Sequence, residues 1–199
     1  YSDIKDAIML ALNGKIIEQK FNYDFKENKK TSYYKRRIEA TPLNKGIRNW
    51  FKESKLKFKY EVTFKEGVFF DSLQTTGFDF AHIDDQYNLV NFRNFCSGRR
   101  AVFNGQESWQ KELDKRPLWK DLSKNMNIVT AIGTDLEFKK QIPTVLGEIQ
   151  FGNWGLVYRD ILKVIQIERD EDVDLFIYIT ATGNLANAIS DGTVKFEKS

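Results

Sequence analysis

Apolar and charged side chains alternate over residues 133–151, and this pattern constrains the fold more than any other part of the sequence. Such alternation is typical of β-strands, in which neighbouring side chains point to opposite faces of a sheet. Residues 139–143 separate two alternating halves, and Pro143 cannot donate a hydrogen bond to a central ladder. We therefore predict a β-hairpin whose strands cover residues 127–138 and 144–151.

The predicted hairpin brings acidic side chains together. Asp135 and Glu137 share one face of the first strand, while Glu148 and Gln150 share one face of the second. Opposed side chains of a hairpin stand about 4.5–5.5 Å apart at their Cβ atoms. Two like charges about 4 Å apart repel by roughly 4 kcal/mol even at an effective dielectric constant near 20. We therefore expect a cation or a shared proton between these acids.

A hard divalent cation prefers ligands of this kind, namely carboxylates, backbone carbonyls and water. We predict Mg²⁺ bound by Glu148, by the carbonyl oxygen of Ile149, and by Asp135, Glu137 or both. The amide of Gln150 can orient an attacking water and donate to a phosphate, but it carries no charge. The pattern therefore predicts a site for a hard divalent cation.

Other parts of the chain have clear local patterns. Thr41-Pro42 is typical of a helix start, and the helix is expected to continue through Phe51. Residues 57–70 alternate as a second hairpin with its turn at Gly67. A helix over 157–169 is followed by an apolar strand over 174–180. Together with the first hairpin, this order predicts an α/β (α+β) fold, a mixed central sheet flanked by helices.

The motifs around the acids are Gly-Thr-Asp-Leu-Glu-Phe at 133–138 and Gly-Glu-Ile-Gln-Phe-Gly-Asn-Trp at 147–154, followed by 158–163 and 190–192. They resemble the active-site region of the BglII and BstYI restriction endonucleases, a group of the PD-(D/E)xK nucleases. Those enzymes carry Gln where most relatives carry Lys, and Gln150 stands at that position. Alignment on Phe138 favours Glu137 as the first acid, whereas alignment on residues 133–134 gives Asp135.

The resemblance implies one restriction-endonuclease-like domain over 1–199, with a catalytic core at about 127–197, a basic N-terminal region at 1–60 and an insertion of unknown role at 61–126. It implies a Mg²⁺-dependent type II enzyme that cuts double-stranded DNA as a homodimer, at a short palindromic site with a GATC-like centre. Ten residues are candidate DNA contacts, from the resemblance or from their basic surroundings: Asn44, Lys45, Arg48, Arg99, Arg100, Asn153, Arg159, Lys163, Ser190 and Asp191.

The charge distribution agrees with a polyanionic substrate. Residues 1–60 hold 15 Lys and Arg against 7 Asp and Glu, whereas the other 139 residues hold 16 against 21. One cysteine excludes a disulfide framework and a Cys-rich zinc site, and no apolar run is long enough to span a membrane. We expect a cytoplasmic enzyme. A repair or junction nuclease of the same superfamily and a DNA-binding module without cleavage remain alternatives.

Overall fold

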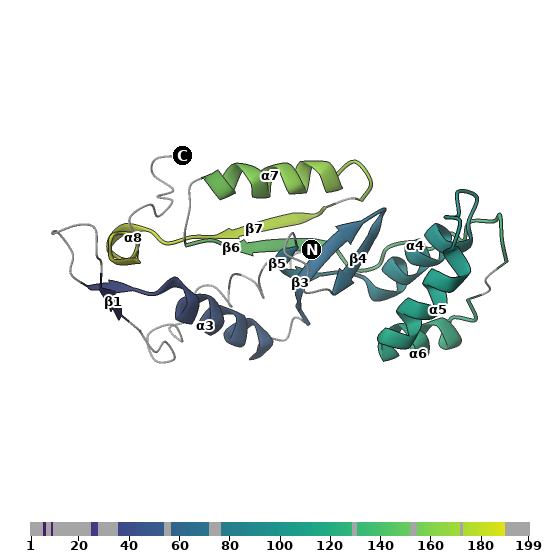
Figure 1. Cartoon of the computed structure of the whole chain (residues 1–199), viewed down its shortest axis with the longest axis horizontal. Helices are drawn as coiled ribbons and strands as arrows, with labels where there is room; N and C mark the ends of the chain where they lie inside the picture. The colour runs from purple at the N-terminus through teal and green to yellow at the C-terminus, as the bar shows by residue number, and fades with distance from the viewer. Residues whose placement is uncertain are drawn as a thin grey trace.

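In the computed structural model, a five-stranded mixed sheet forms the centre of the protein (Figure 1). The structure describes residues 36–53, 57–71, 77–128, 131–151, 155–171 and 173–189, together with 25–27, Asp6 and Met9. In sheet order the strands are β4 (Val68–Asp71), β3 (Lys59–Lys65), β5 (Phe78–His82), β6 (Val145–Ile149) and β7 (Leu175–Ile179). All neighbours run antiparallel except β6 and β7, which are parallel. The predicted fold class is confirmed.

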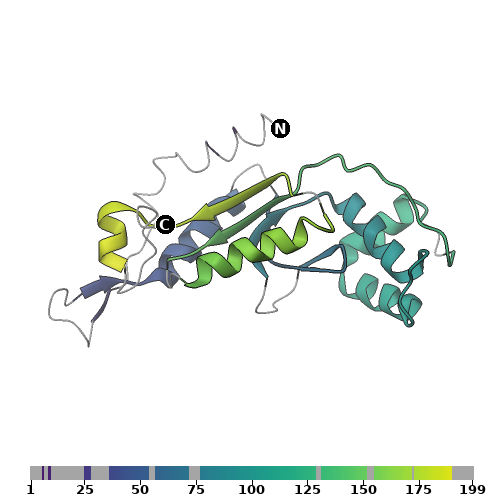
Figure 2. The same ribbon diagram turned by 90° about the horizontal axis from the view of Figure 1, so that it is seen from above.

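Helices cover both faces of this sheet. Helix α7 (Gly155–Ile167) lies on one face and connects the parallel strands β6 and β7, while α3 (Ala40–Glu53) and α8 (Gly183–Ile189) lie on the other (Figures 1 and 2). A short antiparallel pair, β1 (Phe25–Glu27) and β2 (Arg36–Ile38), forms a sheet of its own. None of the described helices has the length and apolar character required to cross a membrane.

Strand β6 is buried on both of its faces. Ile149 packs with Leu43 and Phe51 of α3 in one hydrophobic cluster. Leu146, which points to the opposite face, packs with Ile167 of α7 in a second cluster. All five residues of β6 are buried. Any charged side chain on this strand must therefore be neutralised by groups that surround it.

A helical unit lies between β5 and β6 in the sequence. It consists of α4 (Asp85–Ser97), α5 (Gly105–Lys115) and α6 (Pro117–Asn125), and it forms the right-hand end of the molecule in Figure 1. Its core contains Phe92, Trp109 and Trp119, and it packs against β4 through Val68. The unit therefore has its own hydrophobic cluster and separates β5 from β6 along the chain.

Several local predictions are confirmed. Helix α3 begins next to Thr41-Pro42 and includes Phe51. Strands β3 and β4 form the predicted hairpin, whose turn contains Gly67 at φ +79°, a conformation that glycine adopts without strain. Helix α7 and strand β7 lie close to their predicted bounds.

The predicted hairpin of residues 127–138 and 144–151 is wrong. Residues 131–141 form no strand, and β6 pairs with β5 and β7 instead. Helix α4 binds the backbone of this segment: the buried Arg93 donates to the carbonyls of Thr134 and Ala131, the latter at 2.6 Å. Asn94 donates to Leu136 O and accepts from Leu136 N, both at 2.8 Å. These side chains provide the hydrogen bonds that a neighbouring strand would otherwise give.

Candidate active site

Polar side chains form a row across four neighbouring strands. The register between β5 and β6, continued by one residue, sets Asp79 opposite Glu148. The register between β3 and β5 leaves Glu61 opposite Asp79 in the same way. On the far side, Tyr178 of β7 is the registered partner of Glu148. Three carboxylates therefore stand on adjacent strands in the middle of the sheet.

Two contacts fix Asp79 beside β6. Phe80 lies so close to Gly147 that a Cβ atom on this glycine would overlap its ring, which lets β5 approach β6 closely. The Oδ2 atom of Asp79 accepts a hydrogen bond from Ile149 N at 2.7 Å. The carboxylate of Asp79 therefore continues the pairing of the two strands beyond their last backbone pair.

Glu148 is a buried carboxylate with one direct cationic partner among the described residues. Its side chain lies under α7, where Lys163 Nζ donates to Glu148 Oε1. Burial raises the pKa of the Glu148 carboxyl to about 7, although Lys163 acts in the opposite direction; the negative charges of Asp160 and Asp79 add to the increase. Glu148 therefore lies in a site that favours additional positive charge.

Arg48 of α3 neutralises the other two acids of the row. It donates to Asp79 Oδ1 at 2.5 Å and to Glu61 Oε1. Glu61 has φ +53°, an unfavourable backbone conformation for a residue with a Cβ atom. Backbone strain of this kind persists where the surrounding contacts hold it, and it is frequent at functional sites.

Two buried oxygen atoms around Glu148 have no hydrogen-bond partner among the described residues. They are Asp160 Oδ2 and the hydroxyl of Tyr178. Asp160 is completely buried, and its other oxygen forms an ion pair with Lys163 Nζ at 3.1 Å. Buried polar atoms are nearly always satisfied by protein, water or an ion. These atoms and the carboxylates make a donor set of oxygens only, which fits a hard divalent cation.

A pair of neighbouring carboxylates could hold a divalent metal. No group of three His, Cys, Asp or Glu side chains within the described ranges is arranged to hold a metal alone. Magnesium is usually bound by one or two carboxylates, with water and substrate phosphate completing its octahedral shell. Asp79 and Glu148 are the two carboxylates that fit this role.

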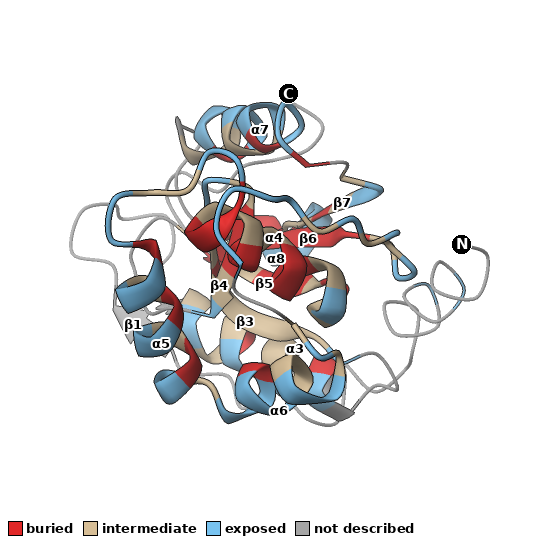
Figure 3. Ribbon diagram, turned by 90° about the vertical axis from the view of Figure 1, so that its right-hand side faces the viewer, coloured by how far each residue is buried: buried red, intermediate tan, exposed pale blue. Residues whose placement is uncertain are grey.

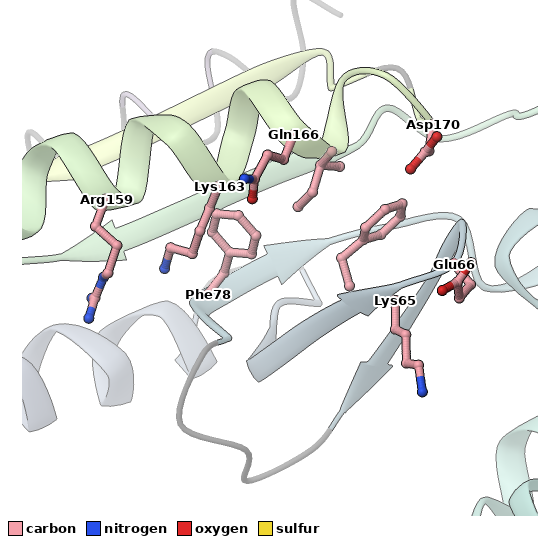
Figure 4. A pocket seen from close by; sticks show the side chains of 9 residues that line it. Lys65, Glu66, Phe78, Arg159, Lys163, Gln166 and Asp170 are labelled. Carbon is pink, nitrogen blue, oxygen red and sulfur yellow. The ribbon is translucent and has the colours of Figure 1, made fainter.

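A cavity of ≈ 530 Å³ lies between α7 and the β3–β4 hairpin (Figure 4). Arg159 and Lys163 extend from α7 on one side, and Lys65 lies on the other. Its apolar lining contains Phe64, Phe78 and Ile167. Glu66 and Asp170 also line the cavity, and Lys163 is the lining residue that contacts Glu148.

The structure does not bring Asp135 or Glu137 to Glu148. The places beside Glu148 in the sheet belong to Asp79 and Tyr178. Asp135 Oδ1 instead accepts from Arg99 N at 2.9 Å, in the turn after α4. Glu137 is exposed on the segment that α4 binds. The prediction of a shared site was wrong because it depended on the hairpin.

Four other predicted site residues lie on or next to β6, α7 and α3. Gln150 directly follows β6, two residues after Glu148, and its N–H donates to Ile179 O at 2.9 Å. Ile149 lies between them, with its N–H bound to Asp79. Lys163 and Arg48, which are candidate DNA contacts, also bind acids of the row, and their contact with DNA stays a prediction.

The remaining candidate DNA contacts lie on several surfaces. Lys45 is exposed on α3, whereas the Oδ1 atom of Asn44 is buried and has no partner among the described residues. Arg99 and Arg100 are exposed after α4 and line a second cavity of ≈ 650 Å³. Arg159 is half-exposed and pairs with Asp160 at 3.1 Å. Asn153, Ser190 and Asp191 lie outside the described residues.

Sequence reasoning missed Asp79, which lies within the region expected to be an insertion. The signal was a single acid between Phe78 and Phe80 in a short apolar stretch. An acid with aromatic neighbours in a buried strand requires a specific partner. The helical unit α4–α6 separates Asp79 from Glu148 in the sequence, so their proximity could not be read from local spacing.

Comparison with known proteins identifies the family of the chain. The profile of the restriction endonuclease BglII/BglIII family matches residues 15–199, which is most of the chain. No curated protein and no solved structure gives a significant match. The family match covers the acidic row, α7 and the helical unit α4–α6. The chain therefore belongs to the BglII/BglIII family of restriction endonucleases, and it is a type II enzyme that cuts DNA at specific sites.

Proposed function

We propose that this endonuclease depends on Mg²⁺ and hydrolyses each strand of a short palindromic site as a homodimer. The observation that carries this proposal is the placement of Asp79 opposite Glu148, with both acids held by cationic side chains. Like charges so close together are stable only when cations neutralise them. A site of this kind is prepared for a divalent cation and a phosphate.

Each residue of the site has a separate task in this proposal. Asp79 and Glu148 hold Mg²⁺, which when bound lowers the pKa of a coordinated water and neutralises charge on the phosphate. Gln150 orients the attacking water through its amide. The exposed cations Lys45, Arg99 and Arg159 contact the phosphate backbone, which fixes the position of the duplex without reading its sequence.

Base recognition is assigned to residues that follow β6 and α8 in the sequence. The resemblance to the BglII and BstYI enzymes suggests Asn153, Ser190 and Asp191 as base contacts and a GATC centre for the recognition sequence. Asn can form two hydrogen bonds with adenine, and Asp can accept from the amino group of cytosine. Sequencing the ends of a digested plasmid library identifies the recognition sequence and the cut position.

An exposed apolar stripe on α7 supports the homodimer. Tyr158, Ile161, Leu162 and Ile165 are 63%, 44%, 56% and 56% exposed. They follow the i, i+3, i+4, i+7 spacing of one helix face, and Figure 3 shows the outward side of α7 largely exposed. A second copy of the chain is the occupant we propose, because a palindromic site requires two active sites related by a two-fold axis.

Glu148→Gln tests the active site. Glutamine keeps the size of the side chain and can still accept from Lys163, but it removes the negative charge. We expect wild-type enzyme to cut plasmid into discrete bands in Mg²⁺ and to lose activity with EDTA. The variant should bind the same duplex and cut at least about 10³-fold more slowly. Cleavage by the variant at the wild-type rate would reject the site.

Leu162→Asp tests the dimer, because a carboxylate in the middle of an apolar contact is costly to bury. We expect sedimentation to show a shift towards monomer and the cleavage rate to fall with dilution. Leu118→Asp is the matched control, since Leu118 is a similarly exposed leucine on α6. Equal behaviour of the two variants would reject α7 as the interface.

A further inference from the structure

The positive charge beside Glu148 does not come from the strand that carries this residue. Gln150 stands two residues beyond Glu148, and its amide is neutral. The ammonium group that touches Glu148 belongs to Lys163, on the helix that follows the strand. Figure 4 shows Lys163 extending from α7 towards Phe78, at the beginning of β5. The helix therefore places a cation where the strand has none.

Several contacts hold this ammonium group in one position. Lys163 Nζ donates to Glu148 Oε1, lies 3.1 Å from Asp160 Oδ1 and donates to Gly77 O at 3.3 Å. It also lies 4.8 Å from the centroid of the Phe78 ring, within cation–π distance. The side chain is only 16% exposed, and it lines the cavity beside the site. Few other positions are open to it.

We infer that Lys163 is a catalytic residue that contacts the scissile phosphate, with Asp160 as its positioning residue. This inference rests on the proposed function, because it takes Glu148 as a metal ligand. If Glu148 held the metal, Lys163 would keep its ion pair with Asp160. The ammonium then faces the cavity through which the phosphate approaches.

The other cations near the acids are less suited to this task. Both terminal nitrogens of Arg48 are bound to carboxylates, one to Glu61 and one to Asp79. The side chain of Arg159 is 55% exposed, and its described ion pair is with Asp160 rather than with Glu148. Among the described residues, Lys163 is thus the cation that touches Glu148 and lines the adjacent cavity.

The chemical step that Lys163 assists is an ordinary hydrolysis. The oxygen of water forms a bond to phosphorus, and the bond between phosphorus and O3′ breaks with its electron pair remaining on O3′. The water loses one proton to solvent, and O3′ takes one proton from solvent. Lys163 stays protonated throughout, and it stabilises the negative charge that increases on the phosphate oxygens.

Lys163→Met and Lys163→Arg test the inference. Methionine keeps an apolar side chain of similar length over Phe78, and arginine keeps the charge in a different shape. We expect Lys163→Met to lower the single-turnover rate at saturating DNA and Mg²⁺ by about 10²–10³-fold, the usual effect of removing one transition-state donor. The KM for DNA should change much less. Lys163→Arg should retain part of the rate.

A double variant separates chemistry from structure. In Lys163→Met with Gln150→Lys, an ammonium returns to the site from the residue after β6, two positions from Glu148. We expect this pair to recover at least about tenfold of the lost rate, although it does not restore the contact with Asp160. Lys111→Ala is the control for loss of one positive charge, because Lys111 is exposed on α5. Thermal unfolding establishes that each variant is folded.

The outcomes distinguish this inference from the proposed function. If Glu148→Gln abolishes cleavage while Lys163→Met cuts at the wild-type rate, Lys163 is only a structural partner and the inference is overturned. Faster cleavage by Lys163→Met at low Mg²⁺ overturns it too, since Lys163 would then merely compete with the metal. If Glu148→Gln remains active, the proposed site itself fails. If Lys163→Met does not fold, the cleavage rate of Lys163→Arg is the test. A partial loss of rate in that variant supports the inference, and the wild-type rate overturns it.

Discussion

Two acidic stretches of similar appearance have opposite environments in this protein. Glu148 lies on a strand buried on both faces, where Lys163 neutralises it and Asp79 faces it. Asp135 lies on an exposed segment, and its carboxylate accepts from the backbone after α4. Alternation alone therefore does not decide which segments pair. The apolar β5, with Phe80 against Gly147, takes the place beside β6.

Replacement of one acid in each region should give the largest difference in cleavage rate between two variants. Asp79→Asn should reduce the single-turnover cleavage rate by at least about 10³-fold, because the neutral amide is a poor ligand for a divalent metal. The amide oxygen can still accept from Ile149 N, so the variant should fold. Asp135→Asn should leave the rate within about threefold of wild type. Quenched-flow cleavage of an end-labelled duplex measures both.

The opposite result would exchange the roles that we assign to the two regions. Loss of cleavage in Asp135→Asn with full activity in Asp79→Asn would place the metal on the segment that α4 binds. Equal losses in both folded variants would contradict the assignment of separate roles.

Asn94→Ala should separate stability from chemistry. Asn94 makes two hydrogen bonds of 2.8 Å with the backbone of Leu136, and their loss leaves partly buried polar groups unpaired. We expect the free energy of unfolding to fall by about 1–3 kcal/mol. The cleavage rate of the folded variant should remain within about threefold of wild type. Urea denaturation measures the first quantity, and Gln86→Ala, on the exposed side of α4, is the control.

A smaller effect, on the free energy of unfolding, is expected from Glu171, which contacts residues between the two regions in the sequence. Its buried carboxylate accepts from Thr144 Oγ1 at 3.1 Å and lies 3.5 Å from Lys140 Nζ. Burial raises the pKa of Glu171, so the folded state holds its proton more tightly than the unfolded chain does. Its contribution to the free energy of unfolding therefore falls as the pH rises above the ordinary range of glutamate, near about 4.3, and becomes constant above the raised value.

Glu171→Gln removes this titration. Urea denaturation at several values between pH 4.5 and 7.5 should show that wild type loses stability relative to the variant as the pH increases. The subtraction cancels the effect of the other buried carboxylates, including Glu148. Parallel curves for the two proteins would mean that Glu171 has an ordinary pKa in the folded state.

Local features of the fold were predictable because their causes are local. Thr41-Pro42 provides a helix start, and Gly67 allows the turn between two alternating strands. Residues 174–180 are apolar enough to be recognised as a strand, which the structure contains as β7. In these cases a few neighbouring residues determine the structure.

The candidate site was predictable only on one of its strands. Glu148 lies on β6, inside the predicted strand over 144–151, and Gln150 directly follows β6. Asp79 could not be paired with them, because α4–α6 intervene and because residues 131–138 offered a closer match. Arg93 and Asn94 bind the backbone of that segment, and nothing in its own alternation reveals this. Long-range pairing depends on which faces bury each other, and one sequence does not specify this directly.

Anomalous diffraction from crystals of the enzyme with Mn²⁺ and cognate duplex tests the central assignment most directly. Mn²⁺ accepts the same oxygen ligands as Mg²⁺ and scatters anomalously. We predict a peak between the carboxylates of Asp79 and Glu148. A peak at Asp135 or Glu137 with none beside Glu148 would contradict the account.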